Sequence, residues 1–198
     1  GIWIARDAKN ITVEKWKLDC GPVRAAGPNA AGHHGVNIYG GYNLLQDFEL
    51  VCKFYHDLSV ESQYSIYNVF RKGKGKDINF DHHSQDVRKN LFTNIDLGAG
   101  LNIYSSGGSA SPTGINTNET YWNITASKDL QYNNRSGTTS TGATLRSTKN
   151  VAVGIRTATA SAMPDAYGNW YETINPVVLY PKDLYAAQMK LVKNKDIQ

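Results

Sequence analysis

The chain has 198 residues, with 21 Lys and Arg against 17 Asp and Glu, which gives a formal net charge of +4. This length suits one domain with a substantial core, or one domain with an appendage. The charge is too mild for a nucleic-acid-binding protein, and the longest basic run, Arg71–Lys76, is interrupted by glycines. No apolar run approaches the ~20 residues of a membrane span, so the composition excludes nucleic acid and membrane as partners.

The first 35 residues are predicted to begin a repeated β-structure. Trp3–Ala5 and Ile11–Leu18 have strand-like patterns, the second with clean apolar and polar alternation. Gly21–Gly35 is rich in Ala, Gly and Pro without periodicity, which predicts a projecting loop before a strand at Val36–Tyr39. A first coil left open would expose unpaired strand edges. We therefore expect upstream coils or another subunit to cover this end.

The start of the chain and its two cysteines each allow two interpretations. The chain begins with Gly1, and nothing there resembles a signal peptide, so we expect an excised fragment or the mature end of a longer protein. Cys20 and Cys52 are the only cysteines, and they can either pair or act as ordinary buried hydrophobes.

The central part of the chain contains a unit that is repeated three times. Asn43, Asn68 and Asn90 open three similar segments at spacings of 25 and 22 residues. Repeats of roughly 20 to 25 residues with short strands predict a solenoid whose units stack on one another. The Leu/Asn spacing of leucine-rich repeats is absent, which favours a parallel β-helix with these asparagines stacked at a turn. An ordinary antiparallel β-sandwich is the competing interpretation.

After residue 105 the composition changes to Ser, Thr, Gly and Asn. Thr120–Thr125 and Asn150–Arg156 are predicted strands, and Pro181–Leu191 is the only convincing helix. We therefore predict an all-β chain, with parallel β-helix coils over residues 1–108. Residues 109–198 are expected to form a loop-rich β appendage whose terminal helix packs on the coils.

Alternation within the repeats predicts which side chains face outward together. If Phe54 and Phe80 point inward, then Tyr55, Asp81 and Tyr104 form an outward row with neighbours ~4.8 Å apart. Three further rows follow from the same alignment: Lys53, Asn79 and Asn102; His56, His82 and Ser105; Asp57, His83 and Ser106. These rows predict a polar groove along one face.

Several of these motifs resemble a known superfamily. The runs Asn79–His83 and Asn90–Gly98 and the turn Ser105–Gly108 resemble later coils of the pectate-lyase-like superfamily. Its members are right-handed parallel β-helices, mostly polysaccharide lyases, glycoside hydrolases and phage tailspikes. The segments Tyr121–Ile124, Gly168–Glu172 and Leu179–Tyr185 resemble a domain of unknown function that closes β-helix proteins in bacterial polysaccharide-degradation loci. The Asp pairs of polygalacturonases are absent, so the resemblance carries no reaction type.

A polar groove of this kind suits a glycan, because aromatic rings stack on sugars and paired carboxylates can act as acid and base. The predicted catalytic residues are Asp81, Asp57 and His83. The predicted substrate-binding residues are Tyr55, Tyr104, Asn79, Lys53, His82, Arg88 and Glu61. In a lyase, His83 or Tyr55 would be the base and Arg88 or Lys53 would neutralise a uronate carboxylate. The competing interpretation is that Asp81 caps a turn and the neighbouring histidines are satisfied at a corner.

The histidines predict no metal site and no cofactor. They occur as the adjacent pairs His33-His34 and His82-His83, and neighbours on a strand point to opposite faces. Each pair would then offer one ligand at most. The competing interpretation is a zinc site that combines one histidine of each pair with Asp81.

Together these observations predict the C-terminal part of a secreted, periplasmic or surface-exposed bacterial enzyme that degrades an acidic or sulfated polysaccharide. A glycoside hydrolase is narrowly preferred over a polysaccharide lyase. Two hypotheses from different classes compete with an enzyme: a non-catalytic carbohydrate-binding or capping module, and a tailspike-type structural protein.

Overall fold

The computed structural model describes residues 1–20, 33–82, 87–100, 117–128, 149–156, 169–172, 174–175 and 177–195. These residues form a mostly β structure with one short C-terminal helix, α1 (Leu184–Lys195). The strands are β1 (Ile2–Ile4), β2 (Thr12–Leu18), β3 (His34–Ile38), β4 (Leu44–Leu50), β5 (His56–Val60), β6 (Val69–Gly75), β7 (Phe80–His82), β8 (Leu91–Asp96), β9 (Thr120–Thr125), β10 (Val151–Arg156) and β11 (Trp170–Glu172).

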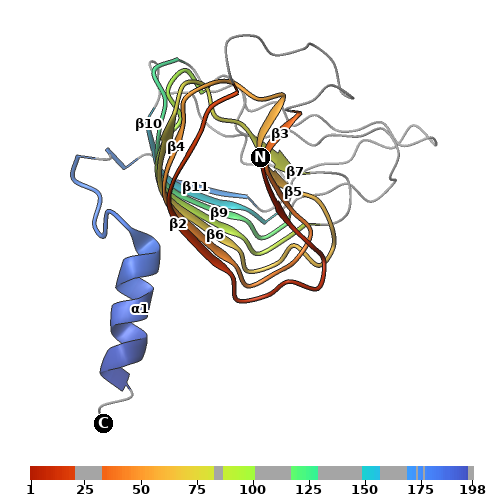
Figure 1. Ribbon diagram of the computed structural model, residues 1–198. Coiled ribbons are helices and arrows are strands. Elements are labelled where there is room, and N and C mark those ends of the chain that lie inside the picture. The colour runs from red at the N-terminus through yellow and green to blue at the C-terminus, as the bar shows by residue number, and fades with distance from the viewer. Residues whose placement is uncertain are drawn as a thin grey trace, which may run out of the picture.

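The strands belong to two parallel sheets. Sheet A has the order β1-β3-β5-β7, and sheet B has the order β11-β10-β9-β8-β6-β4-β2. From β1 to β8 the chain alternates between the sheets, so that each pass adds one strand to both (Figure 1). Every pairing between these described strands is parallel. The predicted stacking of repeats in parallel is therefore confirmed, and the antiparallel sandwich is wrong.

Buried polar side chains form a ladder at the positions that directly precede the strands of sheet B. The backbone N–H of Asn43 donates to Oδ1 of Asn68 at 3.1 Å, and the N–H of Asn68 donates to Oδ1 of Asn90 at 2.9 Å. The predicted stack of these asparagines is thus confirmed. The same bond continues through three further rungs: Glu119, Asn150 and Asn169. Each rung satisfies a buried backbone N–H that would otherwise be costly to remove from water.

Left-handed backbone conformations form two columns across sheet B. One column lies directly before the ladder and has φ values from 55° to 63°; it contains Asn10, Tyr42, Tyr67, Lys89, Asn118 and Lys149. The other bends β2, β4, β6, β8, β9 and β10 within the strand and has φ values from 52° to 67°; it contains Lys15, Asp47, Lys72, Asn94, Asn123 and Gly154. Such values are unfavourable for most residues other than Gly, Asn and Asp. The parallel pairing of neighbouring strands therefore repeats the same bend from β2 to β10.

Because of this bend, we expect the substitution Lys72→Gly to stabilise the folded protein. Lys72 has a φ of 52° and an exposed side chain, so glycine relieves the strain of a left-handed residue, worth roughly 1 kcal/mol. Lys74→Gly on the same strand is the control, and it should destabilise by roughly 0.5–1 kcal/mol. Urea unfolding of both variants measures the difference. Equal destabilisation by the two glycines would contradict a strained bend.

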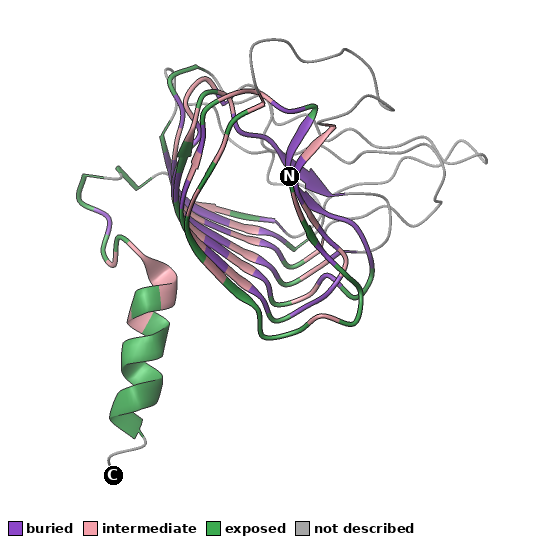
Figure 2. Cartoon of the chain, viewed as in Figure 1, coloured by how far each residue is buried: buried purple, intermediate pink, exposed green. Residues whose placement is uncertain are grey.

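The core lies between the two sheets, as the buried bands along the strands show (Figure 2). Leu45, Phe70, Phe92 and Tyr121 occupy matched positions on four adjacent strands of sheet B, and all are fully buried. Phe80 of sheet A stacks on Phe92 with ring centroids 4.3 Å apart, which joins the two sheets. Stacking of like side chains on successive passes is what makes each repeat depend on its neighbours.

Helix α1 is attached to sheet B at its start. Asp183 caps the helix by accepting the N–H of Ala186 at 3.1 Å, and its carboxylate also pairs with Arg71 of β6. The N–H of Leu184 donates to Thr93 Oγ1 at 3.2 Å. No described residue of α1 is buried, and the helix extends away from the sheets (Figure 1). The first turn therefore contacts sheet B, and further along the helix Met189 and Lys193 line a hollow that is shared with Leu44 of β4.

The predicted boundary between residues 108 and 109 lies outside the described residues. The described strands that follow it, β9 to β11, continue sheet B in register with the earlier ones. Within the described part of the chain, no helix has the length and apolar character required to cross a bilayer.

Candidate functional site

The predicted outward rows have the wrong register. Asp81 pairs with Ser59, not with Tyr55, and His82 pairs with Val60, not with His56. Phe80 correspondingly aligns with Leu58. The alignment of Tyr55 with Asp81 is therefore wrong, and the strand predicted at Cys52–Asp57 begins only at His56.

The loop before β5 explains the error. The chain takes 15 residues from Asn43 to Leu58 but only 12 from Asn68 to Phe80, although both pairs occupy matched positions. The three extra residues lie in the segment 51–55, which precedes the strand. Its apolar and polar alternation imitates a strand, so the pattern by itself misplaces the register.

The structure does place a different set of residues in one row on sheet A. Trp3 pairs with Asn37, Asn37 with Ser59, and Ser59 with Asp81, from β1 to β7. Trp3 is 73% exposed, whereas Ser59 and Asp81 are fully buried. Ser59 Oγ donates to Asp81 Oδ2 at 3.3 Å. The row therefore runs from an exposed aromatic ring to a buried carboxylate.

Asp57 is bound within the structure by three donors. Its carboxylate accepts Lys53 Nζ at 2.6 Å and the N–H groups of Phe54 and Asn79 at 2.8 and 3.0 Å. Asn79 Oδ1 in turn accepts the N–H of Asp57 at 2.7 Å. Burial raises the pKa of the Asp57 carboxyl above its ordinary 3.8, although Lys53 lowers it. The structure thus joins Asp57, Lys53 and Asn79, in an arrangement that connects β5 to the start of β7.

Two other predicted residues, His82 and Arg88, lie outside the row. His82 Nε2 lies 3.1 Å from Tyr121 Oη, and its ring packs edge-on against Phe92 between the sheets, so the predicted outward orientation is wrong. Arg88 forms isolated bridges with Ile66 and Thr117. His83 and Tyr104 fall outside the described residues.

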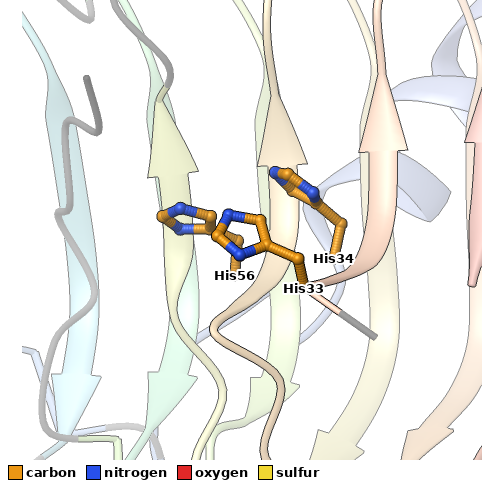
Figure 3. A group of neighbouring side chains, drawn as sticks. All are labelled: His33, His34 and His56. Carbon is orange, nitrogen blue, oxygen red and sulfur yellow. The ribbon is translucent and has the colours of Figure 1, made fainter. Parts of the chain in front are cut away.

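Three histidines, His33, His34 and His56, form a histidine cluster where β3 and β5 begin. The ring centroid of His33 lies 4.4 Å from that of His34 and 4.7 Å from that of His56, and His34 stacks on His56 at 5.0 Å (Figure 3). Tyr55 stacks on His33 at 4.7 Å and is 47% exposed. The cluster therefore has one solvent-facing phenol at its edge.

Two buried carboxylates contact the cluster from the same sheet. Glu61 Oε1 lies 2.8 Å from His34 Nε2, and Asp81 Oδ2 lies 3.3 Å from His56 Nδ1. Tyr39 Oη donates to Glu61 Oε2 at 3.0 Å. Burial, reinforced by the Glu61 carboxylate, raises the pKa of Tyr39 above its ordinary 10.0. These contacts place a carboxylate oxygen beside one ring nitrogen of His34 and one of His56.

A pocket of about 420 Å³ opens beside the cluster. Its lining includes Trp3, His34, Asn37 and Tyr39. Trp3 and Tyr39 meet edge to face with centroids 6.2 Å apart. An exposed indole, a phenol and an amide around one hollow are the groups that sugar rings and hydroxyls contact.

A second groove, of about 490 Å³, crosses the bend of sheet B. Its charges pair with one another: Lys72 lies 3.9 Å from Asp47, and Lys17 and Lys74 lie 3.8 and 3.6 Å from Glu49. These are exposed ion pairs on a solvated face, and such pairs contribute little to the free energy of unfolding. The histidine cluster is therefore the stronger candidate for chemistry.

The cluster also contradicts the expectation of one ligand per histidine pair. His33 precedes β3, which begins at His34, so strand alternation does not separate the two rings. One ring nitrogen from each of His33, His34 and His56 lies within 4.8 Å of the others. Asp19, Cys20 and Cys52 form another close group, but the two cysteines are joined in a disulfide.

Comparisons of the chain with protein-family models, with curated proteins and with solved structures find no match. The geometry of the site is therefore the basis for assigning a function.

Proposed function

We propose that the two stacked sheets are coils of a right-handed parallel β-helix, and that the chain binds and cleaves an acidic polysaccharide on the outer face of sheet A. One observation carries this proposal. The row from Trp3 through Asn37 to Asp81 runs across adjacent strands, beside the pocket and the histidine cluster. A linear glycan laid across the strands would meet an aromatic platform first and the imidazoles next.

Within this proposal the contacts favour elimination over hydrolysis. A hydrolase needs two carboxyl groups that can reach the glycosidic bond. Asp57 already accepts three hydrogen bonds, and Asp81 is fully buried. Tyr55 is exposed at the edge of the imidazoles and can reach a bound sugar. Tyrosine is a competent proton-transfer group.

The step is a β-elimination at a uronate. The deprotonated oxygen of Tyr55 takes the proton from the carbon that bears the carboxylate, and the C–H electron pair forms a carbon–carbon double bond. The bond from the neighbouring carbon to the glycosidic oxygen breaks, and that oxygen leaves with the electron pair and takes a proton from water. Positive charge at the histidine cluster would stabilise the negative charge that develops on the uronate.

Two further features support a secreted protein that works in an assembly. The Cys20–Cys52 disulfide is of the kind that persists in oxidising compartments, such as the exterior of the cell or the periplasm. Strands β1 and β2 end the two sheets, and upstream coils or another subunit covering them would protect these edges.

Tyr55→Phe tests the proposed cleavage. The whole chain is incubated with a panel of uronate polysaccharides, and the ultraviolet absorbance of the unsaturated product is followed. The variant should lose roughly 10²–10⁴-fold in rate because the proton-transfer group is removed. Tyr42→Phe is the matched control, since Tyr42 is equally exposed but stacks on Tyr67.

Two results would overturn the elimination. New reducing ends without unsaturated product would indicate hydrolysis by Glu61 and Asp81. Their nearest oxygens lie within 4.8 Å of each other, close to the ~5–5.5 Å between the carboxyl groups of retaining glycosidases. Binding without any product would identify a carbohydrate-binding module.

A further inference from the structure

We propose that the histidine cluster binds a divalent transition-metal ion, with Zn²⁺ as the best fit. The three imidazoles are brought together by two different strands, β3 and β5, and one nitrogen from each lies within 4.8 Å of the other two. Figure 3 shows the three rings gathered at one point. Three histidines that leave a fourth position open make a common zinc ligand set.

Binding an ion requires the rings to turn toward one point. With Zn–N distances near 2.0–2.1 Å and tetrahedral angles, ligand nitrogens lie about 3.3 Å apart. The rings of His33 and His56 lie 4.7 Å apart between centroids and meet edge to face. His34 and His56 are stacked with their planes 28° apart, so rotation of one of these side chains is needed before both nitrogens point at the same ion.

The surrounding carboxylates match the outer shell of a metal site. Histidine ligands usually give their second nitrogen to a carboxylate, which fixes the tautomer and orients the ring. Here Glu61 contacts His34 at 2.8 Å and Asp81 contacts His56 at 3.3 Å. One ligand atom from each of His34, Glu61 and Asp81 also lies within 4.8 Å of the others, so the two carboxylates are close enough to orient the rings, and a water molecule can fill the fourth position on the ion.

The donor atoms also select the class of ion. Imidazole nitrogens favour Zn²⁺, Cu²⁺, Ni²⁺ and Fe²⁺. Calcium and magnesium require mostly oxygen ligands. This assignment does not depend on the proposed cleavage. If both hold, the ion supplies the positive charge next to the uronate.

The experiment measures metal binding directly. The full chain is stripped with a chelator and titrated with ZnCl₂ by calorimetry, and with Co²⁺ by visible absorbance. We expect one ion per chain and a cobalt spectrum typical of tetrahedral nitrogen ligands. His33→Ala and His56→Ala should each weaken binding by at least about 10-fold, and Glu61→Gln by about 10- to 100-fold through lost ring orientation.

His82→Gln is the matched control, because His82 lies in the core against Tyr121 and outside the cluster. Circular dichroism checks the fold of every variant, and Zn²⁺ should raise the Tm of the wild type but not of His56→Ala. Absence of saturable zinc binding by the wild-type chain would overturn the proposal, whatever the variants do. Unchanged affinity in both histidine variants would also overturn it. Neither result would bear on polysaccharide cleavage, which is measured separately.

Discussion

Raising the pH from 4.5 to about 8 should destabilise the fold by about 4–5 kcal/mol, and Glu119 should account for most of that loss. Glu119 is fully buried, and burial raises the pKa of its carboxyl from 4.5 to about 8. Between these values the folded chain holds a proton that the unfolded chain has released. The stability that this group contributes is therefore greatest below pH 4.5, falls by about 1.4 kcal/mol per pH unit, and levels off above about 8.

Glu119→Asn isolates this effect. Glu119 takes a rung of the ladder and accepts both the N–H and the Nδ2 of Asn90, at 2.9 and 3.0 Å. Asn68 Oδ1 accepts the same two groups from Asn43, so asparagine fits this role. The variant should lose most of the pH dependence and exceed the wild type in stability at alkaline pH.

Urea unfolding at both ends of the pH range measures the difference. Asp57, whose pKa burial also raises, adds a loss of the same sign in both proteins and cancels in the comparison. Glu14→Asn is the control, because Glu14 is exposed. An equally steep pH dependence in Glu119→Asn would show that another group is responsible.

The ladder also shows how far the sequence predicts the fold. Asn43, Asn68 and Asn90 recur at 25 and 22 residues, so their stacking follows from spacing. The later rungs are separated by 29, 31 and 19 residues, and one of them is Glu119. Because their spacing is irregular and the residue type changes, these rungs cannot be recognised from the sequence. Their position is determined by the strands that they connect.

The left-handed bends could not be predicted from residue type. Tyrosine and lysine carry no preference for positive φ, yet Tyr67 and Lys72 adopt it. In the mid-strand column, Asp47, Asn94, Asn123 and Gly154 have a local reason to do so. Stacking on neighbouring passes overrides local preference in the rest.

The rows predicted for the candidate site pair the wrong residues across the strands. Alternation within a strand predicts faces, whereas the residues that meet across strands depend on the lengths of the loops between them. The pairs Asn37 with Ser59 and Ser59 with Asp81 are both 22 residues apart, the same spacing as Asn68 to Asn90. That repeated spacing is the signal that identifies the row. His34 and His56 are separated by the same 22 residues.

Removing the Cys20–Cys52 disulfide should cost about 3–4 kcal/mol of stability. The two cysteines are 32 residues apart in sequence, and a closed loop of this size restricts the unfolded chain by about that amount. The bond connects the segment after β2 to the segment after β4, which belong to successive passes. The loop that it closes contains His33 and His34.

The prediction is tested in two ways, by replacing both cysteines and by reducing the disulfide of the wild type. Cys20→Ala combined with Cys52→Ala should lower the midpoint of urea unfolding, and a reducing agent should lower the wild-type midpoint to a similar value. The same reducing agent should leave the double variant unchanged, because it has no disulfide to break. A loss below about 1 kcal/mol by both routes would mean that the ladder and the aromatic stack already hold these passes together without the bond.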